Sequence, residues 1–346
     1  MKSFFRAFTA LVGLLAGTPF ALADGGVINI DVSVKFIQDS NGNDPFAGSG
    51  GTHRFNSDTD VQTEIDRGNT ALRNTFRGYR LNLVETLRIK PPKPAGETDA
   101  DYWYTLDARS NRAVFEAAAK ASKAVWKWSE TAINIYINDS GSGQCSFVGQ
   151  GEAISLGVTI YANGTTVHEI GHFFNLSHTH SGDPPSVPVP FTVADLSDGD
   201  SLAETRTDHA KASANQLSQV VYGQNYSALN ATQKADIDTV FENVMSYHNE
   251  NELLEQQMNI WSDIANDNVR HKYVRGTTRF VDSSVASSGF GTSTSPIKVL
   301  GIAVTAASTV ERDILLLRPG TYTATTISKP LVLRATRTGP ATIQKP

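Results

Sequence analysis

Residues 168–178, with the sequence HEIGHFFNLSH, place three histidines and one glutamate within eleven positions. On an α-helix, His168 and His172 are four residues apart and lie on one face, one turn above the other. Their imidazoles can then reach the same ion. Glu169 is next to the first histidine and can approach a metal-bound water without ligating the metal itself. This H-E-x-x-H spacing predicts two zinc ligands and a general base on one helix.

A third ligand would complete the site, because a catalytic zinc has three protein ligands and an open fourth position. His178 lies six residues beyond His172, and a continuing helix would carry it about 9 Å further along the axis. The helix must therefore end near Asn175, in a left-handed conformation that asparagine adopts most readily after glycine. We expect Asn175 to turn the chain so that His178 reaches the metal. The alternative is a fortuitous histidine helix in the core, which a correctly spaced third histidine disfavours.

The N-terminus has the pattern of an export signal. Lys2 and Arg6 precede a short apolar run, and small residues at the end of that run predict cleavage after Ala23. The alternative, a membrane anchor, is disfavoured because the run is too short to span a bilayer. We therefore expect residues 1–23 to be a signal peptide and the mature protein to be secreted or periplasmic. The single cysteine, Cys145, excludes an internal disulfide.

Length and charge narrow the range of partners. A chain of 346 residues is long enough for about two domains. A formal net charge of -5 gives no electrostatic reason to expect nucleic acid or an anionic membrane as a partner. Beyond the first residues, no stretch approaches the length of a membrane span. We therefore expect no nucleic acid as a partner and no integral membrane segment.

Hydrophobic periodicity predicts an α/β domain over 24–275. Alternating apolar residues at 27–37 indicate a half-buried strand, and Asp58 or Asp60 is expected to cap the helix that follows. Thr165 or Thr166 is expected to cap the helix that carries the histidines. Strands are expected at 27–37, 81–89, 132–137 and 156–161, and further helices at 60–77, 111–128, 212–221, 228–242 and 252–270.

The histidine segment resembles the extended zinc motif of the metzincin metallopeptidases, with Asn175 in the glycine position. Residues 242–247, ENVMSY, resemble the methionine turn of that family, and the Met-x-Tyr arrangement is similar to its astacin, serralysin and pappalysin branches. The resemblance implies a fold with a twisted mixed sheet and an active-site helix. It also implies that Met245 packs beneath the ligands and that the Tyr247 hydroxyl helps to stabilise the oxyanion of the reaction.

The neighbouring segments are most similar to pappalysin (cytophagalysin) enzymes. AINIYIND, GQCSF, an apolar strand before the motif and the acidic stretch DGDSLAET follow the order of that family. The resemblance covers 125–275 well and 27–125 loosely, and it does not cover the tail. It implies a secreted zinc endopeptidase that acts on protein or peptide substrates and in which His168, His172 and His178 bind Zn²⁺. Glu169 would act as general base on the zinc-bound water, and the strand near 157–161 would be the substrate edge.

Two other functions compete with this one. The first is a catalytically silent surface or glycan-binding protein that keeps zinc as a structural element. The presence of Glu169 speaks against it, because a purely structural site has no need of that carboxylate, and Tyr247 adds to the case. The second is a zinc hydrolase that acts on non-peptide bonds, which the motif alone leaves open.

Weaker signals concern calcium and single side chains. The acidic loop formed by Asp195, Asp198, Asp200, Glu204 and Asp208 suits either a calcium site, with Asp198, Asp200 and Asp208 as ligands, or a solvated loop. Cys145 is expected to be a plain semi-buried cysteine rather than an inhibitory thiol. His180 and His248 are expected to be exposed loop residues. The residues expected in the core are Trp126, Trp128 and Trp261.

The tail, 285–346, has a different composition, rich in Ser, Thr, Val and Gly. Short apolar runs at 314–317, 322–327 and 331–334 are separated by turn residues, which predicts short strands. The tail resembles the opening rung of a pectin-lyase-like right-handed β-helix. One rung cannot bury its own apolar face, so either it packs on the first domain or it belongs to a longer architecture. Surface or glycan contact through this segment is an open expectation.

Overall fold

The computed structural model describes residues 28–45, 57–141, 143–157, 164–182, 184, 186–248, 251–307 and 313–345. The expected signal peptide, 1–23, lies outside these residues. So do positions 158–161 of the strand that was expected to form the substrate edge.

The described residues form a mixed α/β protein with three groups of strands. The helices are α1 (Asp58–Asn74), α2 (Tyr102–Thr105), α3 (Ala108–Ala121), α4 (Lys123–Trp126), α5 (Thr165–Phe173), α6 (Ala214–Tyr222), α7 (Ala231–Phe241), α8 (Glu255–Ala265) and α9 (Leu300–Ala306). The strands are β1 (Ile28–Ile37), β2 (Tyr79–Ile89), β3 (Ile133–Asn138), β4 (Gly143–Cys145), β5 (Ala153–Gly157), β6 (Val274–Arg275), β7 (Thr278–Val281), β8 (Asp313–Leu317), β9 (Gly320–Thr323), β10 (Leu331–Ala335) and β11 (Ala341–Gln344).

The main sheet is a six-stranded mixed sheet with the order β2-β1-β3-β5-β4, and β6 pairs with β1. The pairs β1–β2, β1–β3 and β3–β5 are parallel, whereas β4 runs antiparallel to β5. A mixed sheet was expected and is present, whereas the strand expected as the substrate edge, near 157–161, falls almost wholly outside the described residues. β5 ends at Gly157 and lies between two strands, so the outer strand on this side of the described sheet is β4, residues 143–145.

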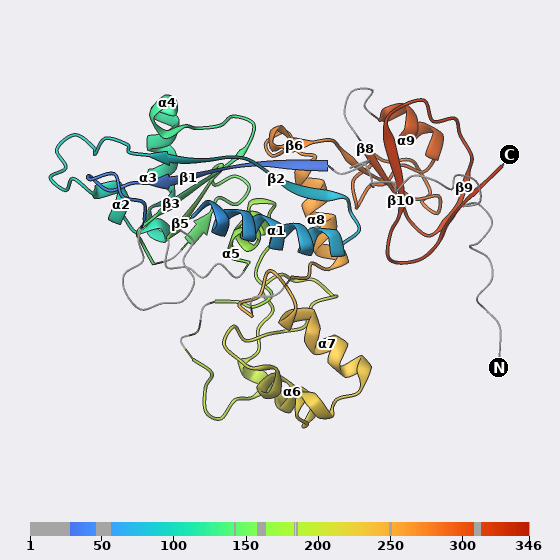
Figure 1. The fold of residues 1–346 in the computed structure, drawn as a ribbon. Coiled ribbons are helices and arrows are strands. Elements are labelled where there is room, and N and C mark those ends of the chain that lie inside the picture. The colour runs from blue at the N-terminus through green and yellow to red at the C-terminus, as the bar shows by residue number, and fades with distance from the viewer. Residues whose placement is uncertain are drawn as a thin grey trace, which may run out of the picture.

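Helices cover both faces of this sheet (Figure 1). One face packs against α1, α5 and α8 through residues such as Ile65, Ile170 and Trp261. The other face packs against α2, α3 and α4 through aromatic side chains, and the expected core residues Trp126 and Trp128 are buried here. Because both faces are covered, β1 is buried along almost its whole length, and the expectation of a half-buried strand was wrong.

Polar residues on the second face of β1 keep hydrogen-bond partners inside the sheet. The Ser33 hydroxyl donates to Glu85 at 2.5 Å, and the Lys35 ammonium donates to Asn134 Oδ1 at 2.7 Å. Burial lowers the pKa of Lys35 to about 7. The polar residues that alternate with apolar ones in this strand are therefore buried and hydrogen-bonded rather than exposed to solvent.

Two helix boundaries differ from expectation. Ser57 caps α1, and Asp60 completes a capping box with it, so neither expected aspartate is the cap itself. The helix expected at 111–128 is divided into α3 and α4, and α4 ends at Trp126, followed by Lys127 with a φ of 51°.

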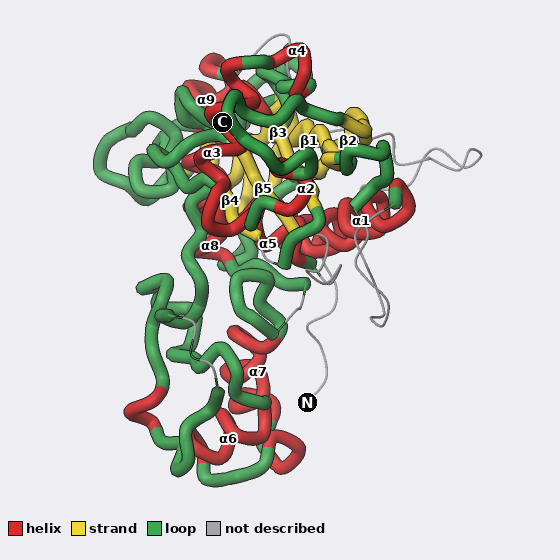
Figure 2. Tube along the Cα trace, turned by 90° about the vertical axis from the view of Figure 1, so that its left-hand side faces the viewer, coloured by secondary structure: helices red, strands yellow, loops and turns green. Residues whose placement is uncertain are grey.

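A separate lobe contains α6 and α7, and both views place it away from the main sheet (Figures 1 and 2). Its small apolar cluster is formed by Leu217, Leu229, Ile237 and Val240. In sequence the lobe lies between His178 and Met245. Among the helices that the structure describes, none combines the length and the apolar character that a membrane span requires.

The tail forms two small parallel sheets, β10-β8-β7 and β11-β9. The first begins at Thr278, ahead of the expected boundary at 285. Alternate residues of β8 face different cores: Ile314 and Leu316 join the main cluster, whereas Leu315 and Leu317 join the tail cluster with α9. The tail therefore packs on the first domain, which was one of the two expected arrangements.

Candidate metal centre

Helix α5 carries two of the three histidines, and its start is fixed from a distance. Gly164 precedes the helix with a φ of 87°, and no side chain of the helix itself caps it. Instead, the buried Glu64 carboxylate of α1 accepts the backbone N–H of Gly164 at 3.1 Å and that of Thr166 at 3.4 Å. The expected cap by Thr165 or Thr166 was wrong. No local signal could identify Glu64, which lies 100 residues away along the chain.

The end of α5 agrees with the sequence prediction. Asn175 has a φ of 67°, in the left-handed region. The Leu176 N–H turns back to donate to the Gly171 carbonyl at 3.0 Å, and the Asn175 N–H donates to His172 at 2.8 Å. Asparagine thus does what glycine would do at this position, and the chain returns toward the helix.

The three histidines converge on one point. Nε2 of His168 lies 3.1 Å from Nε2 of His172 and 3.1 Å from Nε2 of His178, and the last two atoms are 2.9 Å apart. Within the described residues, this is the only group of three or more His, Cys, Asp or Glu side chains close enough to share an ion. Tetrahedral zinc with Zn–N bonds near 2.0–2.1 Å separates its nitrogens by about 3.3 Å, so the donor set fits such an ion.

Hydrogen bonds on the far side of two rings select the required tautomer. Nδ1 of His168 donates to the Val244 carbonyl at 2.7 Å, and Nδ1 of His172 donates to the Leu176 carbonyl at 2.6 Å. With Nδ1 protonated, the Nε2 lone pairs face the common point. Burial lowers the pKa of His168 to about 4, of His172 to about 3 and of His178 to about 2, so all three rings are neutral at pH 7.

The methionine turn lies directly beneath α5. Met245 is fully buried, and a Cβ added to Gly171 would lie 2.4 Å from its sulfur. The turn is held by two bonds: the Met245 N–H donates to Asn243 Oδ1 at 2.8 Å, and its carbonyl accepts the Thr179 N–H at 3.2 Å. The sequence prediction placed Met245 beneath the ligands but gave no role to Gly171, whose missing side chain makes the contact possible.

Glu169 is buried beside the histidines and faces the outer strand of the sheet. Burial raises its pKa to about 7, against the opposing effects of the nearby Cys145 N–H and thiol and of the Arg109 charge. Cys145 itself is fully buried at the end of β4. The thiol is not one of the three clustered donors, which agrees with the expectation of a plain cysteine, but it is fully buried where a semi-buried side chain was expected.

Tyr247 lies at the rim of the histidine cluster. Its ring centre is 4.9 Å from that of His178 and 6.0 Å from that of His168. His180 packs against both: its ring stacks on His178 at 5.0 Å and lies 4.5 Å from Tyr247. The expectation that His180 is exposed was wrong, because it is 2% exposed. His248 is half-buried, stacked on Phe241 at 4.0 Å.

The acidic loop does not assemble the expected set of three carboxylates. Asp198 accepts the Ser201 N–H, and Asp200 accepts the Leu202 N–H and the Thr205 hydroxyl. Asp208 is fully buried, accepts the His209 N–H at 2.6 Å and lies 3.4 Å from His248 Nε2. Each carboxylate thus stabilises a different turn. The described residues do not bring Asp198, Asp200 and Asp208 together as calcium ligands.

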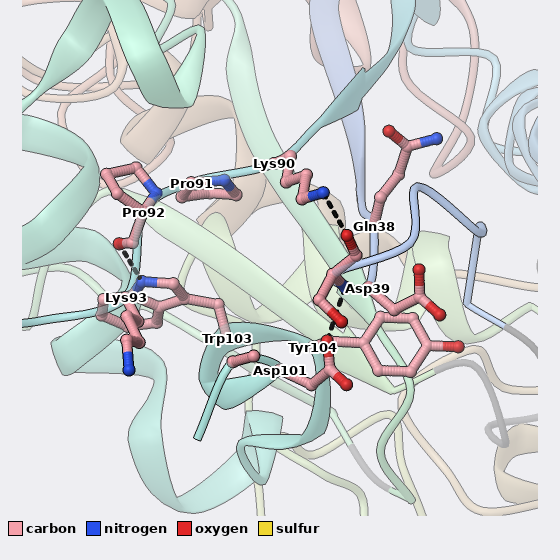
Figure 3. A pocket seen from close by; sticks show the side chains of 11 residues that line it. Gln38, Asp39, Lys90, Pro91, Pro92, Lys93, Asp101, Trp103 and Tyr104 are labelled. Carbon is pink, nitrogen blue, oxygen red and sulfur yellow. Dashed lines mark hydrogen bonds between the residues drawn. The ribbon is translucent and has the colours of Figure 1, made fainter. Parts of the chain in front are cut away.

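A separate pocket of about 350 Å³ lies where β1 and β2 end (Figure 3). The Trp103 indole donates to the Pro92 carbonyl at 2.9 Å, and the Lys90 ammonium donates to the Ser40 carbonyl. Asp101 accepts the Ser40 N–H at 2.5 Å. These three bonds engage the polar groups of Lys90, Trp103 and Asp101 with the backbone of the pocket, and the pocket does not include any residue of the histidine cluster.

No family model matches this chain, and no curated protein matches it. A search of solved structures lists a chain from "Structure of a chaperone-substrate complex", at 14% sequence identity and a TM-score of 0.30. The match covers 46% of this chain and 25% of that chain. A similarity of this degree says nothing about the fold or the function of the protein, so the functional argument rests on the site itself.

Proposed function

We propose that the protein is an exported zinc-dependent endopeptidase of the metzincin type, most similar to the pappalysin branch. One observation carries the proposal: three neutral imidazoles direct their Nε2 atoms to a common point, with a buried carboxylate on the residue next to the first of them. A structural zinc site is closed by four protein ligands, whereas three donors with an adjacent base are typical of hydrolytic sites.

His168, His172 and His178 would hold the metal. Nitrogen donors suit Zn²⁺, and the Nδ1 hydrogen bonds to backbone carbonyls orient two of the rings for it. When bound, zinc supplies a Lewis acid that polarises a carbonyl and makes water acidic near neutral pH.

Glu169 acts as the general base in this proposal. Its pKa of about 7 allows the carboxylate to accept a proton from the attacking water at neutral pH and to return that proton to the leaving amine. Tyr247 supports the same step from the other side. A phenol at the rim of the cluster donates a hydrogen bond to the carbonyl oxygen as negative charge develops on it.

The outer strand β4 offers a binding edge for an extended substrate. The Ser146 N–H, which follows β4, donates inward to Ala153 at 2.9 Å. Alternate backbone groups of an antiparallel edge strand point outward, where a peptide can pair with them. Because Glu169 lies at this same strand, a peptide on β4 passes beside the base.

The test compares the mature zinc-loaded protein with Glu169→Gln on an unstructured protein substrate, with bound zinc measured in both. We expect one zinc per chain in each, cleavage by the parent only, and loss of that cleavage on chelation. Zinc binding without cleavage by the parent would favour a silent zinc-containing surface protein. Equal cleavage by both proteins would refute Glu169 as the base.

A further inference from the structure

One buried carboxylate contacts the surroundings of the metal centre without belonging to the ligand set. Asp208 is 0% exposed, and its backbone pairs with that of Ser197 through two hydrogen bonds of 2.8 Å. Its Oδ1 atom accepts the His209 N–H at 2.6 Å. These contacts fix the chain on which Asp208 lies. A buried carboxylate is costly unless its other acceptor positions are also used, so the remaining contacts of this side chain are informative.

Those remaining contacts reach two other segments of the chain. The Thr179 hydroxyl donates to Oδ2 at 3.3 Å, and the His248 Nε2 atom lies 3.4 Å from each of the two oxygens. Thr179 directly follows the third histidine of the cluster, His178. His248 directly follows Tyr247. One carboxylate therefore contacts the neighbour of a metal donor and the neighbour of the phenol at the rim.

Two further contacts join the same segments in other ways. The Thr179 N–H donates to the Met245 carbonyl at 3.2 Å, which fixes the backbone ahead of Tyr247. The Tyr247 ring lies 4.9 Å from the ring of His178, which limits how far the phenol can tilt. Asp208 differs from both because it acts on the residue after Tyr247. The three contacts together hold the tyrosine from both sides along the chain.

His248 also connects the site with the separate lobe. Its ring stacks on that of Phe241, the last residue of α7, with the ring centres 4.0 Å apart. Its N–H donates to the Ser246 hydroxyl at 3.1 Å, which is a contact inside the turn itself. The side-chain contacts with Asp208 and Phe241 therefore anchor the turn from outside. The chain between the third histidine and the methionine turn thus supports the site as well as separating its two parts.

We propose that Asp208 is a positioning residue of the metal centre: through Thr179 it holds the loop that carries His178, and through His248 it holds the backbone that carries Tyr247. Neither contact touches the reacting atoms. The part that concerns Tyr247 rests on the proposed function. The part that concerns His178 rests on metal binding alone and can be measured without any cleavage.

The first experiment measures zinc affinity and cleavage in Asp208→Ala and Asp208→Asn. Loss of a contact around a metal ligand typically costs about 10- to 100-fold in affinity, and Asp208 acts one residue away, so we expect the zinc Kd of the alanine variant to rise by about 10-fold. At saturating zinc we expect kcat to fall by about 10-fold with KM within about twofold, because the tyrosine is less well placed in the transition state. Asparagine has the same shape, keeps one acceptor and should recover part of both losses.

Substitutions of the two partners separate the two contacts. Thr179→Val removes the hydroxyl and should raise the zinc Kd by about fivefold, with kcat at saturating zinc within about twofold of the parent. His248→Phe keeps a ring to stack on Phe241 and removes Nε2. It should lower kcat by about 10-fold and leave the zinc Kd within about twofold. In the double variant with Asp208→Ala, Thr179→Val should have little further effect on zinc, because the same contact is already lost.

Asp313 provides a matched control. It is also 0% exposed and accepts a backbone N–H, that of Thr277, at 3.1 Å. It begins β8 in the tail sheet β10-β8-β7. Asp313→Ala should lower Tm and leave the zinc Kd and kcat within about twofold of the parent. Equal losses of zinc affinity and kcat in Asp313→Ala and Asp208→Ala would show that a missing buried carboxylate acts through stability alone, and would overturn the inference.

Zinc affinity distinguishes failure of this inference from failure of the proposed function. A parent that binds zinc but cleaves nothing, with a raised zinc Kd in Asp208→Ala and Thr179→Val, would support the positioning of His178 and reject the peptidase. Unchanged zinc Kd and kcat in Asp208→Ala would overturn the inference, as would a parent that binds no zinc. If Asp208→Ala does not fold, the partner variants decide. An unchanged zinc Kd in Thr179→Val together with an unchanged kcat in His248→Phe would then overturn it.

Discussion

The metal segment, residues 168–178, and the edge hairpin, residues 143–157, meet at Glu169 but are built in different ways. In the metal segment, some contacts that shape the histidines are local, such as the bond from His172 Nδ1 to Leu176, four residues away, although the bond from His168 Nδ1 reaches Val244, 76 residues away. In the edge hairpin they are distant: Glu116 lies 37 residues from Ala153, and Arg270 lies 124 residues from Ser146. The spacing of the three histidines and the turn at Asn175 are therefore encoded locally, whereas the strand beside Glu169 depends on the whole fold.

Removal of a ligand should give the largest effect and should be confined to the metal segment. We expect His178→Ala to lose zinc on dialysis and to lose all zinc-dependent cleavage, because two imidazoles do not form a catalytic zinc site. The edge hairpin should keep its structure, since His178 belongs to none of the apolar clusters. Zinc analysis and circular dichroism would measure both effects.

His271→Ala is the control for this prediction, because that histidine bonds to the Ala265 carbonyl away from the cluster. It should keep both zinc and cleavage. Retention of stoichiometric zinc by His178→Ala would mean that the three donors do not act as a set.

The edge hairpin should be most sensitive at Glu116. This buried carboxylate pairs with Arg112 at 2.8 Å and Lys120 at 2.7 Å, and it accepts the Ala153 N–H at 3.2 Å. We expect Glu116→Ala to lower the free energy of unfolding by about 3–5 kcal/mol, because it leaves a buried guanidinium without its partner. Urea unfolding of the metal-free protein measures this loss.

Glu116→Gln keeps an acceptor of the same shape and should lose less stability than Glu116→Ala. If the alanine variant were as stable as the parent, the hairpin would not depend on its distant contacts, and the contrast with the metal segment would fail.

Gly171 is a further point at which the metal segment depends on a distant residue, besides the bond from His168 to Val244. A side chain there would displace the Met245 sulfur, which lies 2.4 Å from the position of an added Cβ. We expect Gly171→Ala to cost about 1–3 kcal/mol of stability through overpacking. In a Met245→Ala background the same substitution should cost less, and thermal unfolding of the four proteins measures the coupling. Equal costs in both backgrounds would show that the two residues do not press on each other.

The sequence predicted local features of this molecule better than distant ones. The convergence of the three histidines, the positive φ of Asn175 and the strand at 132–137 follow from spacing over a few residues. The outer position of β4 could not be predicted in this way, because strand order depends on pairings that the residues of β4 do not encode. The cap from Glu64 and the burial of His180 have the same origin: each depends on a packing partner elsewhere in the chain.

Glu64 allows a pH-dependent test of such a distant contact. Burial raises the pKa of this carboxyl, so the folded protein binds its proton more tightly than the unfolded chain does. Glu64 therefore stabilises the folded protein below its ordinary pKa of 4.5. That contribution to the free energy of unfolding is lost as pH rises through the higher pKa of the folded state. Glu64→Gln should therefore gain stability relative to the parent between pH 4 and pH 8. Urea unfolding at pH 4 and at pH 8 measures the difference in stability between the variant and the parent. The same difference at both pH values would show that the Glu64 carboxyl does not titrate in this range.

The smallest effect is expected at Asn175, where the dependence of the turn on its own residue can be checked directly. Asn175→Gly should change the free energy of unfolding by no more than about 0.5 kcal/mol, because both residues tolerate a φ of 67°. Asn175→Ala should cost about 1–2 kcal/mol, since its Cβ opposes the left-handed conformation. The side chain at 175 is exposed, so no packing loss obscures the comparison. If alanine proved as stable as glycine and zinc affinity were unchanged, the turn that returns His178 to the cluster would be imposed by tertiary packing. The conformation of the metal segment would then depend on distant contacts as much as that of the edge hairpin does.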